Sequence, residues 1–124
     1  MMISISFIVP SFNDEKDIKN KLKILEMKLS KNKINFEIIV VNDGSSDKTQ
    51  IQIRSINSKK INLLNNYTNR GKSFSIRRAL KQCKYKNIIM IDSDLPYFNK
   101  IDYLIKNLEK GYDFIYIDRR NPKS

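Results

Sequence analysis

The sequence predicts an α/β fold with three layers, in which helices cover both faces of a mainly parallel sheet. Short apolar segments rich in Ile and Val alternate with amphipathic segments, and this alternation gives the order β-α-β-α-β-α-β-α-β. The apolar segments carry almost no charge, which is typical of parallel strands buried on both faces. At 124 residues the chain has the length of one domain, 1–124.

Five apolar segments are expected to be strands. Their ranges are 2–9, 36–41, 61–64, 87–91 and 113–117. We expect the first strand to end at Pro10, because proline cannot donate a hydrogen bond to a sheet. Turn-forming residues at 42–47 follow the second strand and separate it from the next helix.

Four amphipathic segments between the strands are expected to be helices. Their apolar residues recur at helical spacing in four sets: Ile18, Leu22, Leu25 and Leu29; Ile51 and Ile56; Ile76, Ala79, Leu80 and Cys83; Ile101, Leu104, Ile105 and Leu108. We expect Asn13 or Asp14 to cap the first helix and Asp47 the second, because their side chains accept hydrogen bonds from free helix amides. The third helix is expected over 72–84, after Gly71.

The chain is basic, with 24 Lys and Arg against 13 Asp and Glu and a net charge of +11. Such a charge suits nucleic acid, an anionic membrane face or a phosphorylated ligand, and compositional bias toward Lys, Asn and Ile also accounts for it. No arginine-rich stripe with interleaved aromatic residues accompanies the charge. We therefore expect no nucleic-acid partner, whereas a negatively charged ligand stays compatible.

Several classes of site are excluded by the rarity of two residue types. With one cysteine and no histidine, the chain cannot form an internal disulfide or a Ser-His or Cys-His catalytic pair, and a Cys/His zinc site is disfavoured. No apolar run is long enough to span a membrane, and 1–10 lacks the basic region of a signal peptide. The predicted location is the cytoplasm, with peripheral contact at the inner face of the cell membrane as an extension of that prediction.

Polar residues gather where the predicted strands end. They fall at 10–15, 42–46, 69–72, 92–94 and 118–120. Because the carboxyl ends of parallel strands share one edge of a sheet, where ligands of α/β proteins bind, these segments predict a common ligand site.

Asp92 and Asp94 stand two residues apart after a buried strand. Two carboxylates so close repel each other unless a cation or a donor lies between them. Oxygen ligands suit Mg²⁺ or Mn²⁺, with substrate phosphates completing the shell. The alternative is that Asp94 caps the next turn while Asp92 is solvated.

Three further residues have both a structural and a functional interpretation. Asp43 either forms a turn or cap, or accepts a hydrogen bond from a base or ribose. Arg70 and Lys72 either belong to a turn and a helix start, or bind a diphosphate. Cys83, on an apolar helix face, is expected to pack in the core.

Four motifs in register resemble the N-terminal half of glycosyltransferase family 2, nearest to its dolichyl- or polyprenyl-phosphate sugar transferases. The motifs are FIVPSFNDE at 7–15, EIIVVNDGSSDKT at 37–49, NRGK at 69–72 and IDSDL at 91–95. The resemblance implies the Rossmann-like, A-type nucleotide-sugar fold of that family, here truncated, because the family domain is usually about twice as long.

The resemblance also implies roles for individual residues. Pro10, Asn13, Glu15 and Asp92 would line the nucleotide-sugar pocket, with Asp43 on the base and Arg70 and Lys72 near the nucleotide or its phosphates. Asp92 and Asp94 would hold Mg²⁺ or Mn²⁺, and Arg119 would lie near the acceptor phosphate. No residue is implied as the catalytic base.

The function implied is transfer of a sugar from a UDP- or GDP-sugar to a lipid phosphate or a saccharide, by a metal-assisted inverting mechanism. Such a reaction belongs to cell-envelope polysaccharide or lipid-linked sugar biosynthesis. Three features depart from the family pattern: Ile117 and Asp118 replace a Gly-Ser pair, PYF at 96–98 replaces a Gln and a proline-rich turn, and the acceptor half is missing. A second chain could supply that half. The alternative is a truncated donor-binding module without transferase activity of its own.

Overall fold

A computed structural model describes residues 2–92, 101, 105–106 and 114–117. In these ranges five parallel strands form one sheet in the order β3-β2-β1-β4-β5. The strands are β1 (Ile3–Ser11), β2 (Ile34–Asp43), β3 (Ile61–Asn66), β4 (Asn87–Ile91) and β5 (Phe114–Ile117). The predicted α/β class and parallel sheet are therefore confirmed.

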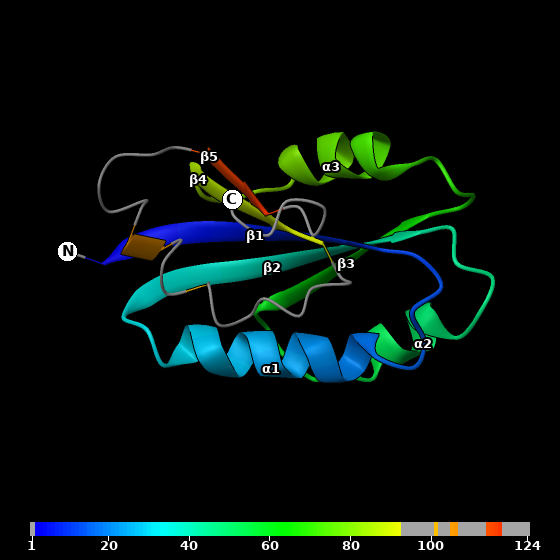
Figure 1. The fold of residues 1–124 in the computed structure, drawn as a ribbon, viewed down its shortest axis with the longest axis horizontal. Coiled ribbons are helices and arrows are strands. Elements are labelled where there is room, and N and C mark those ends of the chain that lie inside the picture. Colours follow the sequence, from blue (N-terminus) through cyan, green and yellow to red (C-terminus); the bar gives the residue numbers. More distant parts are fainter. Residues whose placement is uncertain (1, 93–100, 102–104, 107–113, 118–124) are drawn as a thin grey trace.

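Helices lie on both faces of the sheet (Figure 1). The helices α1 (Ile18–Ser30) and α2 (Thr49–Arg54) cover one face, and α3 (Lys72–Leu80) covers the other. The predicted fourth helix falls mostly outside the described residues, although Ile101 and Ile105 are helical and buried. Within the described ranges no helix has the length and apolar character needed to cross a bilayer.

Each face of the sheet buries its own apolar cluster. Phe7 and Val9 of β1 point toward α1 and pack with its buried residues Leu22 and Leu25. Ile8, between them in sequence, packs on the opposite side in the cluster that includes Ala79 of α3. Alternate residues of a strand point to opposite faces, so a strand buried on both sides is apolar at most of its positions.

The predicted boundaries of the first strand and first helix are wrong. The strand β1 continues through Pro10 to Ser11. Its pairing with β4 stops at Ile8, so at Pro10 the strand pairs with β2 alone and the missing N–H is tolerated. Neither Asn13 nor Asp14 caps α1, whose N-cap position is held by Asp17 without a side-chain hydrogen bond. The carboxylate of Asp14 instead pairs with Lys21 at 3.2 Å.

Two predicted apolar positions face solvent. Ile51 is 63% exposed, because the six-residue α2 turns Ile53 inward instead, and Ile56 lies beyond the helix. Leu80 is 40% exposed at the end of α3, which stops there and not at residue 84. Cys83 does pack against the α3 cluster, as predicted, and burial raises the pKa of its thiol.

A buried carboxylate lies within the sheet at Glu37 of β2. One of its oxygens, Oε2, accepts hydrogen bonds from Ser6 Oγ and from the backbone N–H of Lys84, both at 2.6 Å. The same serine hydroxyl accepts a bond from the Tyr85 amide at 3.2 Å. Glu37 thus ties the segment before β4 to the two central strands.

We expect Glu37→Ala to lower the free energy of unfolding by about 1–3 kcal/mol, because it leaves the Ser6 hydroxyl and the Lys84 amide without their acceptor. Urea unfolding measures this change. Lys23→Ala, at an exposed position of α1, is the control and should change stability by less than about 0.5 kcal/mol. Equal stabilities of the two variants would contradict the role of Glu37.

Candidate functional site

A pocket of about 340 Å³ opens at the carboxyl edge of the sheet. Segments that follow four different strands line it: Pro10, Ser11 and Phe12 from β1; Asp43 from β2; Asn69, Gly71 and Lys72 from the β3–α3 loop; and Asp92 after β4. Of the residues implied by the resemblance, the structure therefore brings Pro10, Asp43, Lys72 and Asp92 together.

Asp43 holds the β3–α3 loop against the sheet. Its side chain is buried, with 5% of the residue exposed. Oδ1 accepts hydrogen bonds from Asn66 Nδ2 at 2.9 Å and from the Arg70 amide at 2.8 Å, and Oδ2 accepts one from the Gly71 amide at 3.0 Å. Both oxygens of this buried carboxylate therefore have hydrogen-bond donors.

Lys72 and Asp92 form an ion pair across the pocket. The distance from Lys72 Nζ to Asp92 Oδ2 is 2.8 Å, and the Asp92 side chain is 17% exposed. Lys72 is the first residue of α3, and Asp92 directly follows β4, so the pair joins two strand-end segments. Asp94 lies outside the described residues, as does Arg119.

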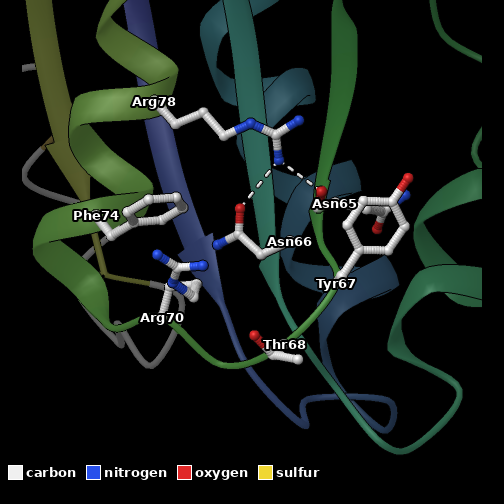
Figure 2. A pocket seen from close by; sticks show the side chains of 7 residues that line it. All are labelled: Asn65, Asn66, Tyr67, Thr68, Arg70, Phe74 and Arg78. Carbon is white, nitrogen blue, oxygen red and sulfur yellow. Dashed lines mark hydrogen bonds between the residues drawn. The ribbon is translucent and has the colours of Figure 1, made fainter.

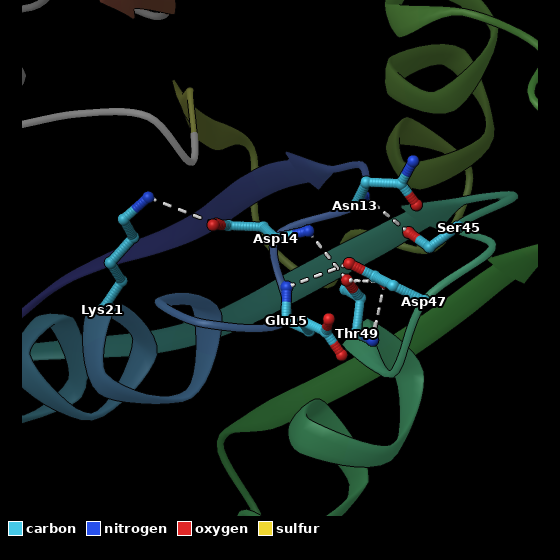
Figure 3. Close-up of polar contacts among 7 residues, drawn as sticks. All are labelled: Asn13, Asp14, Glu15, Lys21, Ser45, Asp47 and Thr49. Carbon is cyan, nitrogen blue, oxygen red and sulfur yellow. Dashed lines mark hydrogen bonds and ion pairs between the residues drawn. The ribbon is translucent and has the colours of Figure 1, made fainter.

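Asn13 and Glu15 do not line this pocket; they fasten the β1–α1 loop to the β2–α2 loop (Figure 3). Asn13 Oδ1 accepts a hydrogen bond from the Ser46 amide, and Asn13 N–H donates to Ser45 Oγ, both at 2.9 Å. Glu15 Oε2 accepts from the Lys48 amide at 3.1 Å. Asn13 has φ of 48°, a left-handed conformation that asparagine tolerates better than most residues.

Asp47 also joins the β1–α1 loop to the β2–α2 loop, and in addition it contacts the first residue of α2. Its Oδ1 accepts hydrogen bonds from the amide and the hydroxyl of Thr49, at 2.9 and 2.5 Å, and its Oδ2 accepts from the Glu15 amide at 3.3 Å. The predicted N-cap is therefore wrong by one residue: Lys48 holds that position, and Asp47, just before it, binds the amide of the first helical residue, Thr49. Partial burial raises the pKa of Asp47, but these hydrogen bonds outweigh it and the pKa is lowered.

The Arg70 side chain lies outside the pocket with Asp92. Its guanidinium is 4.5 Å from the centre of the Phe74 ring and lines a separate hollow that also includes Arg78 (Figure 2). Only the backbone of Arg70 therefore serves Asp43. The resemblance implied that Arg70 lies near the nucleotide or its phosphates, and the structure directs its side chain to this other hollow.

Two residues of the site escaped the sequence analysis. Asn66, buried at the end of β3, donates to Asp43 and to Ser75 Oγ, at 2.9 and 3.0 Å. Ser11 lines the pocket with a buried hydroxyl. The sequence offered only weak indications of these two residues. They are the two asparagines at 65–66, which follow an apolar segment, and the serine that follows Pro10.

A family model described as glycosyl transferase family 2 matches residues 6–124. The chain belongs to glycosyl transferase family 2. An uncharacterized glycosyltransferase of Synechocystis is 32% identical over 124 residues, covering 98% of this chain and 39% of that protein. A dolichyl-phosphate beta-glucosyltransferase of Dictyostelium discoideum is 31% identical over 122 residues, covering 88% and 37%. This family-2 chain thus spans less than half the length of these curated relatives.

Solved structures confirm the A-type fold of the family. A mannosyltransferase from Pyrobaculum calidifontis, in complex with GDP-Man and Mn²⁺, has a TM-score of 0.69 at 21% identity, covering 86% of this chain and 32% of that one. A glucosyl-3-phosphoglycerate synthase from Mycobacterium tuberculosis, in complex with Mn²⁺ and UDP-Glc, has a TM-score of 0.68 at 23% identity, covering 88% and 40%. The alignment covers part of each structure, as expected for a truncated fold.

Gly44 is required where the β2–α2 loop passes the β3–α3 loop. A Cβ at Gly44 would lie 2.3 Å from Asn69 N, and the φ of Gly44 is +71°. Gly71 has a φ of +94°, but a Cβ there would meet nothing within 4 Å.

We expect Gly44→Ala to lower the free energy of unfolding by at least about 1 kcal/mol more than Gly71→Ala, because only the former adds a backbone clash to the cost of positive φ. Urea unfolding of both variants tests this, and equal losses would contradict it.

The lowered pKa of Asp47 predicts a loss of stability in acid. A carboxylate whose pKa is below its ordinary 3.8 when folded stabilises the protein above that pH, and the contribution disappears as pH falls through the folded pKa. Urea unfolding between about pH 5 and pH 2 measures the effect: the free energy of unfolding should fall less steeply with decreasing pH in Asp47→Asn than in the wild type. The control is Asp17→Asn, which removes a carboxylate that makes no capping bond. Its free energy of unfolding should fall with pH as that of the wild type does. Identical slopes in all three proteins would refute the prediction.

Proposed function

We propose that the pocket at the carboxyl edge binds a UDP- or GDP-sugar, and that this family-2 protein transfers the sugar to an acceptor by a metal-assisted inverting mechanism. The observation that carries the proposal is the Ser11 hydroxyl, which is buried, lines the pocket and has no hydrogen-bond partner among the described residues. A buried polar group without a partner costs about 1–3 kcal/mol, so a ligand that supplies one is favoured.

The charges around the pocket support a diphosphate donor. Lys72 offers an ammonium group and is the first residue of α3, and the N-terminus of a helix favours a bound anion. Asp43 uses three of the roughly four acceptor positions of a carboxylate on the protein, which leaves capacity for one donor from a base or ribose. The two solved structures named above carry GDP-Man and UDP-Glc, which supports either base.

The donor set suits a hard divalent cation, Mg²⁺ or Mn²⁺. Asp92 is a partly buried carboxylate at the pocket wall whose present counter-charge is the Lys72 ammonium. Binding of a cation would replace that ammonium at Asp92 and release Lys72 toward the phosphates of the donor. A cation there, with Asp94 as the second ligand, would neutralise charge that develops on the departing diphosphate. Mn²⁺ in the two solved structures supports this assignment.

The acceptor we propose is a lipid phosphate, with a saccharide as the alternative. The dolichyl-phosphate beta-glucosyltransferase relative supports the lipid phosphate. A phosphate oxygen is already anionic, so attack on the sugar would need little help from a general base, and a chain without histidine could perform it. Arg119 is proposed to contact that phosphate, and the reaction to serve lipid-linked sugar or cell-envelope polysaccharide synthesis.

A second candidate is a donor-binding module without transferase activity of its own. One observation favours it: the chain covers only 39% and 37% of the two relatives described above. Under this alternative a second chain supplies the acceptor contacts. Nucleotide binding without hydrolysis or transfer of the sugar identifies the module, whereas turnover of the donor by this chain identifies the enzyme.

We expect UDP or GDP with Mn²⁺ to stabilise the wild type, and Asp92→Asn to abolish the Mn²⁺-dependent part of the shift. At a nucleotide concentration about 100-fold above Kd, mass action adds roughly 2.7 kcal/mol, which is a rise in Tm of roughly 10 °C for a chain of this size. A thermal-shift screen over UDP, GDP, CDP and TDP, each with and without Mn²⁺, measures both effects.

The matched control is Asp17→Asn, which removes one exposed carboxylate at the start of α1. It should keep the full Mn²⁺-dependent shift, because Asp17 does not line the pocket. A shift that persists in Asp92→Asn would overturn the proposed cation site, and the absence of a shift with any nucleotide in the wild type would overturn the donor site as well.

A further inference from the structure

A second pocket lies beside the end of β3, apart from the pocket of Asp43 and Asp92. It has a volume of about 380 Å³ and is bounded by the β2–α2 loop, α2, the end of β3 and α3. The residues that matter for the argument are Ser45, Gln50, Arg54, Asn65, Tyr67 and Arg78. We call it the arginine pocket; it shares no lining residue with the pocket of Asp43 and Asp92.

Arg78 is held in place by neutral acceptors. Its Nη1 donates to the Asn65 carbonyl oxygen at 2.5 Å and to Asn66 Oδ1 at 3.0 Å (Figure 2). Within the described part of the chain, Nε and Nη2 have no hydrogen-bond acceptor. A guanidinium fixed through one nitrogen keeps the rest of its planar set of donors oriented for an oxyanion.

Positive charge in the arginine pocket is not balanced by a carboxylate. Arg54, in the last turn of α2, lines the pocket, and its side chain has no hydrogen bond or ion pair with any described residue. Arg70 lines a hollow of about 170 Å³ that shares Asn65, Tyr67 and Arg78 with it. None of the described residues that line either hollow is acidic. Guanidinium groups gathered without a counter-charge repel one another, and a bound anion removes that cost.

We propose that the arginine pocket binds a phosphate group, either inorganic phosphate or the phosphate of a monoester. Arg54 and Arg78 supply charge-assisted hydrogen bonds, and the side-chain NH₂ of Gln50 supplies neutral donors to the same oxygens. The Tyr67 ring is fully exposed at the rim, where it can contact the organic group of an ester. The site is distinct from the donor pocket, so the proposal stands apart from the proposed transfer reaction.

An NMR titration of backbone amides, with ionic strength held constant by chloride, tests the proposal on the wild-type chain. Inorganic phosphate should shift the amides of Ser45, Gln50 and Tyr67 in a saturable manner at concentrations up to about 10 mM. Phenyl phosphate is the second probe. Tighter binding of phenyl phosphate assigns the site to a monoester, and equal affinities assign it to inorganic phosphate. No saturable shift with either probe would overturn the proposal.

Two variants separate a specific site from general attraction to a basic protein. Arg54→Gln should weaken phosphate binding about tenfold, because it removes one charge-assisted contact from an exposed side chain on which no described hydrogen bond depends. Lys59→Gln removes the same charge at an exposed position outside the pocket and should weaken binding less than twofold. Equal weakening by both variants, or shifts confined to Gly71 and Lys72, would overturn the proposal.

Discussion

The carboxylate of Asp43 is the interaction on which the ligand-binding edge depends. It stands at the last position of β2 and accepts hydrogen bonds from the amides of Arg70 and Gly71, 27 and 28 residues further along the chain. These bonds set where α3 begins and therefore where Lys72 meets Asp92. Without that fixed point, the segment that follows the edge strand β3 would have little to hold it against the sheet.

The sheet itself was predictable because its physical signal is local. Strands buried on both faces are apolar at most positions, and FEIIVV and NIIMI meet that requirement apart from Glu37 and Asn87, without reference to the rest of the chain. The edge strand β3 shows the limit, since INLLNN is only partly buried. Short helices were harder to predict. The six residues of α2 bury Thr49 and a single isoleucine, so the choice between Ile51 and Ile53 depends on the phase of a single turn.

The site was predictable as a set of strand ends, and less so as a set of side-chain directions. Pro10, Asp43, Lys72 and Asp92 meet because parallel strands end on one edge. Asn13 and Glu15 turn instead to the neighbouring loop, with Asn13 in a left-handed conformation that composition cannot reveal. A motif fixes the place of a residue in the chain, but contacts with residues far away in sequence decide what its side chain does.

The side-chain amide of Asn66 is held in a single orientation by its hydrogen-bond partners. Its oxygen accepts a hydrogen bond from Arg78, while its NH₂ group donates hydrogen bonds to Asp43 and to the hydroxyl of Ser75. Rotating the amide by half a turn would set its oxygen against a carboxylate and its NH₂ against a guanidinium, so the group has one orientation only. Asn66 consequently connects Arg78 on one side to Asp43 on the other, at the end of β3, by accepting from the first and donating to the second. Asp has no NH₂ donor and Leu has neither donor nor acceptor, so neither could replace it although both are close to it in size.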